Sequence, residues 1–515
     1  MEESYLKLQK YLEELIPSKY YERLGAVFRT KRNMYVYDTG TGKVFSCNEI
    51  EYRIFESIFN NFDLMKEKLK NYQEEDIIHA IDSIIEVIKT ENILQATDYK
   101  EFARETDQEL NAVLNYSLQS LILEVTQKCN FRCKYCIYHD YNSLYRDYTA
   151  KDMSWETAKK TIDYVKAHCG EKDLSIAFYG GEPLINYDLI HDVIGYCKQI
   201  MSDKSLIFSF TTNLSLMDKN KAAFFAKEGC YIMCSIDGPS IIHDAYRVDA
   251  EGNGTFELVM QGLKNLIEAY GNDAEEKISF NVVICPPYIK DKFDAIKDFF
   301  SQIEWLPPKL TIKYSYVESG SLREEDIDYT YFSKDERKNQ VSEIAPVAEW
   351  TMNKLIDKSD TDYLPYSFAR DALVRVHKRF LSDRPYEKMK RNGCCIPGGR
   401  RIYVDVDGNI ALCERVGKCP PIGNIDTGID INKIKKYYLE DYEKKSLDKC
   451  KNCWAVNLCN ICYAACYRED GIDISSKNEL CYIQRKQIKG ELILYYEVME
   501  EAPDVLANFE EIEVF

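Results

Sequence analysis

Short apolar runs and amphipathic stretches alternate along residues 119–318 of the chain. The apolar runs have the length and β-branched content of buried strands, and stretches between them, such as Trp155–His168, have helical spacing. Alternating strands and helices indicate a parallel sheet with right-handed crossovers, so we predict an α/β fold for residues 116–318. The six predicted strands are Leu121–Thr126, Ser175–Tyr179, Leu206–Thr211, Tyr231–Ile236, Ile278–Cys285 and Leu310–Tyr316.

The amino-terminal part of the chain has a different pattern. Residues 24–46 alternate as strands do, and Tyr35–Phe45 is a predicted hairpin around a glycine-containing turn. We therefore expect a small α+β domain over residues 1–115. Its predicted helices are Glu49–Asn60, Met65–Asn71 and Glu75–Glu91.

Two regions show no motif with evident chemistry. Residues 319–392 are charged and helical, with helices predicted at Ser333–Lys358 and Phe368–Phe380. We expect this segment to bridge the α/β region to the cysteine-rich region that follows it, and to shape a substrate channel. Residues 487–515 indicate a terminal helix and an acidic tail.

Composition narrows the class of protein. The chain has 515 residues, which favours about three domains, and its 45% hydrophobic and 30% charged residues are ordinary for a globular protein. Lys+Arg 67 against Asp+Glu 85 gives a net charge of −18, which argues against a nucleic-acid partner. No apolar run resembles a signal peptide or could span a bilayer, so we predict a cytoplasmic protein without a membrane partner.

Nineteen cysteines are the most unusual feature of the composition. Without a secretion signal they favour metal ligands over disulfides, because the cytosol keeps thiols reduced. Most are clustered. The isolated ones are interpreted as small buried hydrophobes: Cys47, Cys169, Cys197, Cys230, Cys234 and Cys285.

Cys129, Cys133 and Cys136 follow the first predicted strand with C-x3-C-x2-C spacing. Three thiolates can hold three irons of a 4Fe–4S cluster and leave the fourth iron free to bind a small molecule, whereas an electron-transfer cluster normally takes four cysteines. A three-cysteine zinc site is the alternative.

This motif resembles that of the radical S-adenosylmethionine (radical SAM) enzymes. The resemblance implies a partial (β/α)6 TIM-like barrel, with a 4Fe–4S cluster that binds S-adenosylmethionine at the carboxyl ends of the strands. It also implies reductive cleavage of that cofactor to a 5′-deoxyadenosyl radical. Tyr135 matches the aromatic residue that the family places near the adenine, although an exposed loop tyrosine is the alternative.

Further family positions fall at the ends of the next strands. Gly180, Gly181, Glu182 and Pro183 match the turn that offers backbone carbonyls and a carboxylate to the cofactor's ammonium, and paired glycines allow close approach of the backbone. Other positions resemble the family's cofactor contacts, although turn formation or plain core packing explains several of them equally well. They are Asn213, Ser235, Asp237, Arg247, whose guanidinium suits a carboxylate, and Val283.

A second set of cysteines lies near the carboxyl terminus and resembles the SPASM domain, which binds two auxiliary 4Fe–4S clusters, here over residues 393–486. The implied ligands are Cys395, Cys413, Cys450, Cys453, Cys459, Cys462, Cys466 and Cys481. The match is close through Cys459, and the spacing departs from the family after it.

The departure leaves the division of ligands open. By the family scheme Cys395 and Cys413 join the first cluster, with Cys462 or Cys466 crossing over to it. Cys394 and Cys419 are candidates for its fourth ligand, and a substrate thiolate is another. The second cluster takes Cys450, Cys453, Cys459 and Cys481. A zinc ribbon is the alternative interpretation of the 450–462 cysteines.

Glu414 directly follows Cys413. In related sulfatase-maturating enzymes an acidic residue at this position is the catalytic base, so the resemblance makes Glu414 a candidate base. An exposed glutamate paired with Arg415 or Lys418 is the alternative.

The amino-terminal domain resembles the winged-helix domain that captures the leader segment of ribosomally made peptides, in which the leader adds to an exposed strand edge. Together the resemblances imply a radical SAM peptide maturase that installs a cross-link, with a thioether as the leading product and a carbon–carbon bond as another. The implied partners are a precursor peptide and a flavodoxin or ferredoxin as electron donor. A sulfatase-maturating type enzyme is one alternative, and a non-catalytic iron–sulfur or zinc carrier of peptides is another.

Overall fold

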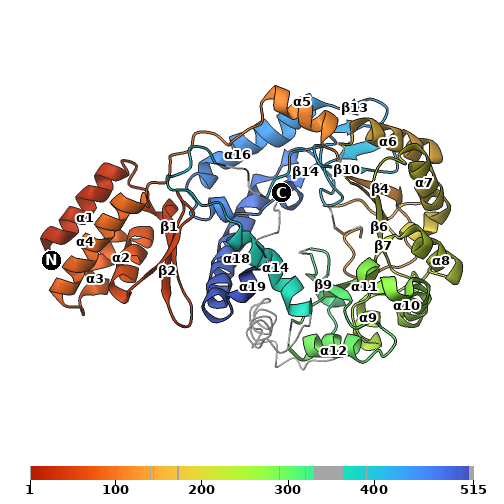
Figure 1. Ribbon diagram of the computed structural model, residues 1–515, viewed down its shortest axis with the longest axis horizontal. Helices are drawn as coiled ribbons and strands as arrows, with labels where there is room; N and C mark the ends of the chain where they lie inside the picture. Colours follow the sequence, from red (N-terminus) through yellow and green to blue (C-terminus); the bar gives the residue numbers. More distant parts are fainter. Residues whose placement is uncertain are drawn as a thin grey trace.

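The computed structural model describes residues 2–509 apart from 140, 143, 171–172, 289, 319, 330–362, 390, 392 and 508. An amino-terminal domain lies at one end of the molecule and a parallel sheet with its covering helices lies at the other (Figure 1). The carboxyl-terminal region lies between them, where α18 (Ile474–Glu501) is next to the amino-terminal strands.

Six adjacent parallel strands, in chain order, make up one side of the largest sheet, and they confirm the six predicted strands. They are β4 (Ser120–Thr126), β5 (Leu174–Gly180), β6 (Leu206–Thr212), β7 (Tyr231–Ser235), β8 (Ile278–Ile284) and β9 (Thr311–Tyr316). The connecting helices are α6 (Trp155–His168), α7 (Tyr187–Ile200), α8 (Lys219–Glu228), α9 (Ser240–Tyr246), α10 (Phe256–Tyr270), α11 (Ala274–Lys277) and α12 (Lys290–Ser301). Strand β9 ends the sheet, which is therefore open.

The sheet continues beyond β4 with strands from the carboxyl-terminal region. Strand β10 (Arg401–Val404) pairs in parallel with β4, and Leu121 lies opposite Ile402. The sheet ends with β11 (Asn409–Ala411), β12 (Gly423–Asn424) and β13 (Gly428–Ile429), all antiparallel. Because β10 covers an otherwise unpaired strand edge, the cysteine-rich region and the α/β region share one sheet and one hydrophobic core.

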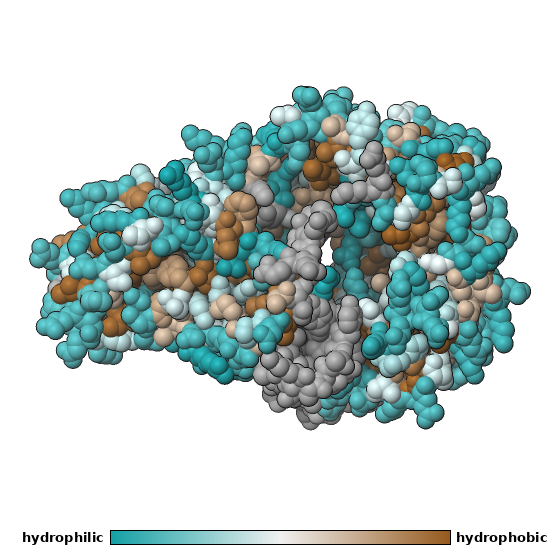
Figure 2. Space-filling view, viewed as in Figure 1, coloured by the Kyte–Doolittle hydropathy of each residue, from teal (hydrophilic) through white to brown (hydrophobic). Residues whose placement is uncertain are grey.

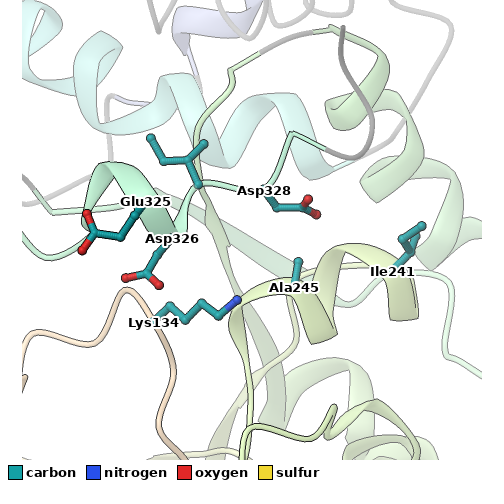
Figure 3. A pocket seen from close by; sticks show the side chains of 7 residues that line it. Lys134, Ile241, Ala245, Glu325, Asp326 and Asp328 are labelled. Carbon is teal, nitrogen blue, oxygen red and sulfur yellow. The ribbon is translucent and has the colours of Figure 1, made fainter. Parts of the chain in front are cut away.

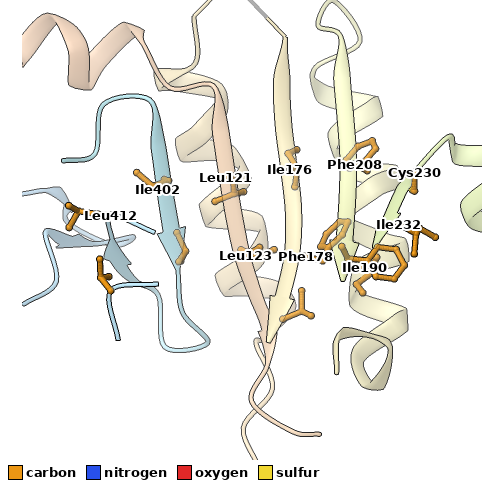
Figure 4. Close-up of a cluster of buried hydrophobic side chains, with 14 of the residues drawn as sticks. Leu121, Leu123, Ile176, Phe178, Ile190, Phe208, Cys230, Ile232, Ile402 and Leu412 are labelled. Atoms are coloured by element: carbon orange, nitrogen blue, oxygen red, sulfur yellow. The ribbon is translucent and has the colours of Figure 1, made fainter. Parts of the chain in front are cut away.

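Apolar side chains on the parallel strands form that core (Figure 4). Alternate residues of β5, including Ile176 and Phe178, are buried, as expected where helices cover a face of the sheet. Every residue of β4 after Ser120 is buried because β4 lies inside the sheet, between β5 and β10.

The amino-terminal domain contains the expected hairpin strands and helices. Strands β1 (Gly25–Arg29), β2 (Met34–Asp38) and β3 (Val44–Cys47) form an antiparallel sheet in that order. The helices are α1 (Glu2–Leu15), α2 (Glu49–Asn60), α3 (Met65–Leu69) and α4 (Glu74–Glu91). Helix α5 (Asp107–Tyr116) begins within the predicted boundaries of this domain, but its Leu110 and Leu114 pack in the core of the large sheet. Helix α1 was not predicted; it buries Leu8 and Leu12 in the core of this domain.

One face of the amino-terminal sheet packs on the carboxyl-terminal helices. Phe28, Tyr35 and Tyr37 share a core with α14 (Tyr363–His377) and α18. Arg375 of α14 donates two hydrogen bonds to Glu491 of α18 at 2.8 and 2.9 Å, which ties these helices together. The predicted helix Phe368–Phe380 is confirmed in α14, whereas Ser333–Lys358 lies outside the described residues.

The remaining carboxyl-terminal elements are short. They are α15 (Ile431–Lys433), a π-helix (Ile434–Glu440), α16 (Asp441–Cys450), α17 (Tyr463–Cys466), β14 (Tyr467–Arg468), β15 (Gly471–Ile472) and α19 (Asp504–Ala507). Helix α18 runs through position 486, where the sequence suggested a boundary. No helix in the described part of the chain is both long and apolar enough to span a bilayer. Most of the face shown in Figure 2 is hydrophilic, with apolar atoms in scattered patches.

Candidate functional site

The loop after β4 brings Cys129, Cys133 and Cys136 together. Its backbone is held in the middle: Arg132 N–H donates to Val248 O at 2.7 Å, and Lys134 N–H donates to Tyr246 O at 2.8 Å. The three thiols lie close enough for their charged forms to interact with one another. Burial raises the pKa of Cys129 to about 12, because a thiolate there would lose its hydration.

The turn after β5 packs directly against this loop. Gly181 N–H donates to Thr126 O at 3.1 Å, and Glu182 N–H donates to Lys128 O at 2.8 Å. A Cβ on Gly180 would lie 2.0 Å from Thr126 O, and one on Gly181 would lie 2.1 Å from Lys128 O. The paired glycines were expected to admit a ligand; what they admit in this structure is the backbone of the cysteine loop.

Glu182 is buried at the ends of β5 and β6. Its Oε2 accepts from Asn213 N–H at 2.7 Å, and its Oε1 accepts from the Thr212 hydroxyl at 2.8 Å and from Leu184 N–H at 3.1 Å. Burial raises the pKa of this carboxyl to about 7, although the hydrogen bonds act in the opposite direction. Pro183 is also buried and begins a single 3-10 turn.

Asn213 and Ser235 end the next two strands. The Asn213 side chain donates to Asn130 Oδ1 of the cysteine loop at 3.0 Å and accepts from Ser215, which holds it beside that loop. Ser235 is the last residue of β7 and is 8% exposed. Both residues therefore lie at the carboxyl-end edge of the sheet, where the glycine turn and the cysteine loop also lie.

Asp237 and Arg247 form a buried ion pair at the same edge. Arg247 Nε donates to Asp237 Oδ2 at 2.9 Å, and the side chains of Arg247 and Asp237 are 7% and 1% exposed. Tyr135 donates to Asp237 Oδ2 at 2.5 Å, and Val283 N–H donates to Oδ1 at 2.9 Å. Arg247 was expected to offer its guanidinium to a ligand carboxylate, but in this structure its carboxylate partner is Asp237.

Two further residues, Tyr148 and His243, lie next to this region. The Tyr148 hydroxyl lies within hydrogen-bonding reach of the Cys136 thiol. His243 lies behind Asp237, whose backbone N–H points at its Nδ1 at 3.4 Å. Burial lowers the pKa of His243 to about 3, so the ring is neutral. Neither residue has a local sequence signal that links it to the motif.

The carboxyl-terminal cysteines form two groups. In the second cysteine group, which consists of Cys450, Cys453, Cys459 and Cys481, each thiol interacts with at least two of the others. The first cysteine group consists of Cys395, Cys413 and Cys462, which interact with one another in the same way. The structure thus brings Cys462, the earlier of the two crossover candidates, to Cys395 and Cys413.

Three cysteines surround the first group. Cys419 interacts with Cys413 and hydrogen-bonds Val416 O through its thiol. Cys466 is fully buried and interacts with Cys462 and Cys481, so it lies between the two groups. Cys394 donates to Ile461 O at 3.8 Å and interacts with Cys466.

The donor sets suit iron–sulfur clusters. Within the described ranges, no three Cys, His, Asp or Glu side chains converge closely enough to hold one metal ion. Each thiolate of a 4Fe–4S cluster binds its own iron, so cluster ligands stand farther apart than the ligands of a single ion. Three loop thiols and two further groups of three and four thiols match that chemistry.

Glu414 lies next to Cys413 of the first cysteine group and near Tyr179 at the end of β5. One carboxylate oxygen, Oε2, is buried and has no hydrogen-bond partner among the residues that the structure describes. Tyr179, directly before the glycine turn, has its hydroxyl within hydrogen-bonding reach of Tyr138, and it lies near Glu414, Cys136 and Arg146. Glu414 is half-buried near Tyr179 and Cys413, and within the described structure it forms no ion pair with Arg415 or Lys418.

A pocket of about 380 Å³ lies beside the cysteine loop. Lys134 forms one side of it, and Glu325, Asp326 and Asp328 lie across from that side chain (Figure 3). Ile241 and Ala245 of α9 complete the wall. The pocket is mostly polar and adjoins the loop without containing any of the three cysteines.

Residues 123–300 match the model of the Radical SAM superfamily. The chain is 25% identical over 368 residues to the cysteine-type anaerobic sulfatase-maturating enzyme of Clostridium novyi. The aligned region covers 68% of this chain and 88% of that protein. It is 23% identical over 363 residues to the radical SAM cyclopropyl synthase TigE of Paramaledivibacter caminithermalis, covering 68% of each.

Among solved structures, native anSMEcpe with bound AdoMet superposes on this chain with a TM-score of 0.50 and 20% sequence identity. The superposition covers 76% of this chain and 100% of that chain, which shows a shared fold. Radical SAM proteins use a 4Fe–4S cluster and S-adenosylmethionine, and the three loop cysteines fit the cluster. Residues 123–300 therefore form a radical SAM domain, and the relatives that are named as enzymes show that the protein is an enzyme.

Proposed function

We propose that the protein is a peptide maturase that installs a cross-link, a thioether or a carbon–carbon bond, in a ribosomally made precursor peptide. The observation that carries this proposal is the position of Tyr179. It lies near Cys136 of the cysteine loop and near Glu414 beside the first cysteine group. A substrate residue held there would be near both the radical source and an electron acceptor.

In this proposal Cys129, Cys133 and Cys136 hold the radical SAM cluster. S-adenosylmethionine binds at the strand ends, where the contacts would come from Tyr135, Gly180, Gly181, Glu182, Pro183, Asn213, Ser235, Asp237, Arg247 and Val283. When bound, the cluster and cofactor supply a 5′-deoxyadenosyl radical that removes a hydrogen atom from the substrate. The chain's own contribution is to hold these groups in a buried, hydrogen-bonded frame, which excludes water from the radical.

The two carboxyl-terminal groups would hold auxiliary 4Fe–4S clusters in a SPASM domain. The second cysteine group supplies four thiols, and the first supplies three, with Cys419 and Cys394 as candidates for a fourth. Cys466 lies between the groups and stays a candidate ligand. These clusters would accept the electron that is released when the cross-link closes.

Glu414 is the proposed base. Its Oε2 is buried without a partner among the described residues, and an unpaired buried carboxylate oxygen is costly unless a ligand donates to it. A substrate N–H, S–H or C–H group about to lose its proton would occupy that position.

The amino-terminal domain is the proposed leader-binding domain. Strand β3 pairs only with β2 among the described strands, so its other edge is available to an added strand. Asp38 N–H donates to Lys43 O at 2.9 Å, so these two residues are a hydrogen-bonded pair at the start of the pairing between β2 and β3. Hydrogen-bonded and non-hydrogen-bonded pairs alternate along an antiparallel ladder. The N–H groups of Val44 and Ser46 therefore point away from β2, to the open edge. A flavodoxin or ferredoxin would supply electrons in the cytoplasm.

A sulfatase-maturating activity is the second candidate, and the 25% identity to the Clostridium novyi enzyme favours it. That activity would oxidise a Cys or Ser of a protein. The leader-binding type of domain at residues 1–115 favours the peptide maturase.

The first experiment is anaerobic reconstitution and reduction of the wild type and of the Cys129→Ala/Cys133→Ala/Cys136→Ala variant, followed by measurement of 5′-deoxyadenosine. Formation that needs the three cysteines supports the radical site. No formation by the iron-replete wild type would favour a non-catalytic carrier.

Incubation with candidate leader-bearing precursor peptides, and with a synthetic sulfatase-site peptide, then separates the two activities by mass spectrometry. A cross-link removes two hydrogens and keeps the sulfur. Oxidation of Cys to an aldehyde loses the sulfur.

A further inference from the structure

Helix α18 places a buried lysine against the second cysteine group. Lys477 is 3% exposed, and its Nζ donates to the Cys450 Sγ at 3.3 Å. It precedes Cys481 by four residues, so both side chains lie on the same face of the helix. Its ammonium also lies 5.3 Å from the ring centroid of Tyr442, which shields it from water.

Among the described residues, no carboxylate forms an ion pair with Lys477. The groups that face Lys477 are the thiols of Cys450, Cys481, Cys459 and Cys466. A second cation, Arg485 of α18, lies within hydrogen-bonding reach of the Cys453 thiol. The second cysteine group is therefore next to two positive charges.

The first cysteine group lies near charges of both signs. Cys413 interacts with the carboxylate of Glu414, while the cations near Cys395 are Arg400 and Arg401, whose side chains are exposed. Exposed charges are screened by water and salt, whereas buried charges act at nearly full strength. The two groups thus differ in electrostatic environment.

This asymmetry matters because reduction adds one negative charge to a cluster. A buried ammonium that donates a hydrogen bond to a ligand sulfur stabilises the reduced cluster more than the oxidised one, which raises the reduction potential. We propose that Lys477 acts through the Cys450 sulfur to raise the reduction potential of the cluster held by the second cysteine group. This inference rests on the proposed auxiliary clusters.

The test uses the full chain in the Cys129→Ala/Cys133→Ala/Cys136→Ala background, so that only auxiliary clusters remain. Iron and sulfide are measured per chain, and a mediated redox titration is followed by electron paramagnetic resonance. The variants are Lys477→Met, which removes the charge, and Lys477→Arg, which keeps it. Lys486→Met is the matched control, since Lys486 is exposed on the same helix.

We expect Lys477→Met to shift one of two midpoint potentials to a more negative value and to leave the other unchanged. Lys477→Arg should restore most of the shift, and Lys486→Met should cause none. Full iron content with both potentials unchanged in Lys477→Met would overturn the role of Lys477 and leave the proposed function intact.

Two other outcomes are separable. Absence of iron from the parent variant would overturn the auxiliary clusters and with them this inference. If Lys477→Met loses iron, Lys477→Gln supplies a neutral side chain that can still donate to the sulfur. Loss of iron from that variant too would show that Lys477 is needed for assembly and would overturn a tuning role.

Discussion

The carboxylate of Glu182 accepts a hydrogen bond from the backbone N–H of Asn213 at 2.7 Å, and this bond joins the ends of β5 and β6 inside the core. The same carboxylate accepts from Thr212 and Leu184. The glycine turn and the next strand end are therefore one unit, and a ligand at the turn is held by a frame that spans two strands.

Replacing Glu182 with Gln should destabilise the protein by about 1–3 kcal/mol. The amide NH2 group of Gln would replace one carboxylate oxygen and would point at N–H or O–H donors, which it cannot accept from. We expect a lower thermal unfolding midpoint of the cluster-free chain and much less 5′-deoxyadenosine from the reconstituted enzyme. Thr212→Val is the comparison variant, since it removes a hydroxyl that donates to Glu182 Oε1 and accepts from Leu214 N–H at 3.0 Å. It should have a smaller effect on both, because the two backbone donors to Glu182 remain. Unfolding and cleavage equal to those of the wild type would show that these bonds do not constrain the turn.

Gly181→Ala should selectively disturb the radical SAM cluster. The new Cβ would lie 2.1 Å from Lys128 O, so the cysteine loop must move. We expect reconstituted iron to fall by roughly the content of one cluster, while the carboxyl-terminal clusters are retained, as measured by iron analysis and by electron paramagnetic resonance.

Gly195→Ala is the control for that substitution. Gly195 lies within α7, and a Cβ added there would have no atom of another residue within 4 Å, so alanine should be tolerated or slightly stabilising. Equal loss of iron in both variants would argue that the close approach at Gly181 is unimportant.

Removing one partner of the Asp237–Arg247 pair should be costly. Asp237→Ala leaves a buried guanidinium without its carboxylate, and we expect a loss of about 3–5 kcal/mol in the free energy of unfolding, measured by urea denaturation of the cluster-free chain. The double variant Asp237→Ala/Arg247→Met should recover part of that loss, because no charge is then buried alone.

The exposed pair Lys159–Asp163 provides the comparison. Asp163→Ala should cost less than about 1 kcal/mol, since water already solvates both charges. A similar cost at the two sites would contradict the role of burial.

Ser46→Pro should weaken leader binding without affecting the radical chemistry. Proline removes an N–H that points away from β2, so the sheet keeps its own hydrogen bonds and only the open edge loses a donor. We expect weaker binding of a precursor peptide by calorimetry and unchanged 5′-deoxyadenosine formation without peptide. Ser46→Ala, which keeps the N–H, should bind as the wild type does; equal binding by all three would exclude this edge.

Local pattern was enough to predict much of this protein. The six parallel strands, helix α2 and the cysteine loop at the end of β4 follow from apolar runs, helical spacing and clustered thiols, all of which are properties of neighbouring residues. The location of Asn213, Ser235 and Asp237 at the same edge of the sheet follows as well, because parallel strands end on one side.

Tertiary structure decided which distant groups meet. Only the folded chain shows that β10 pairs with β4, that Asp237 takes the Arg247 guanidinium, that Cys462 joins Cys395 and Cys413, and that Lys477 reaches the Cys450 sulfur. Periodicity specifies which face of a helix or strand is buried. It does not specify the partner on that face, because the partner depends on how elements far apart in the chain pack against one another.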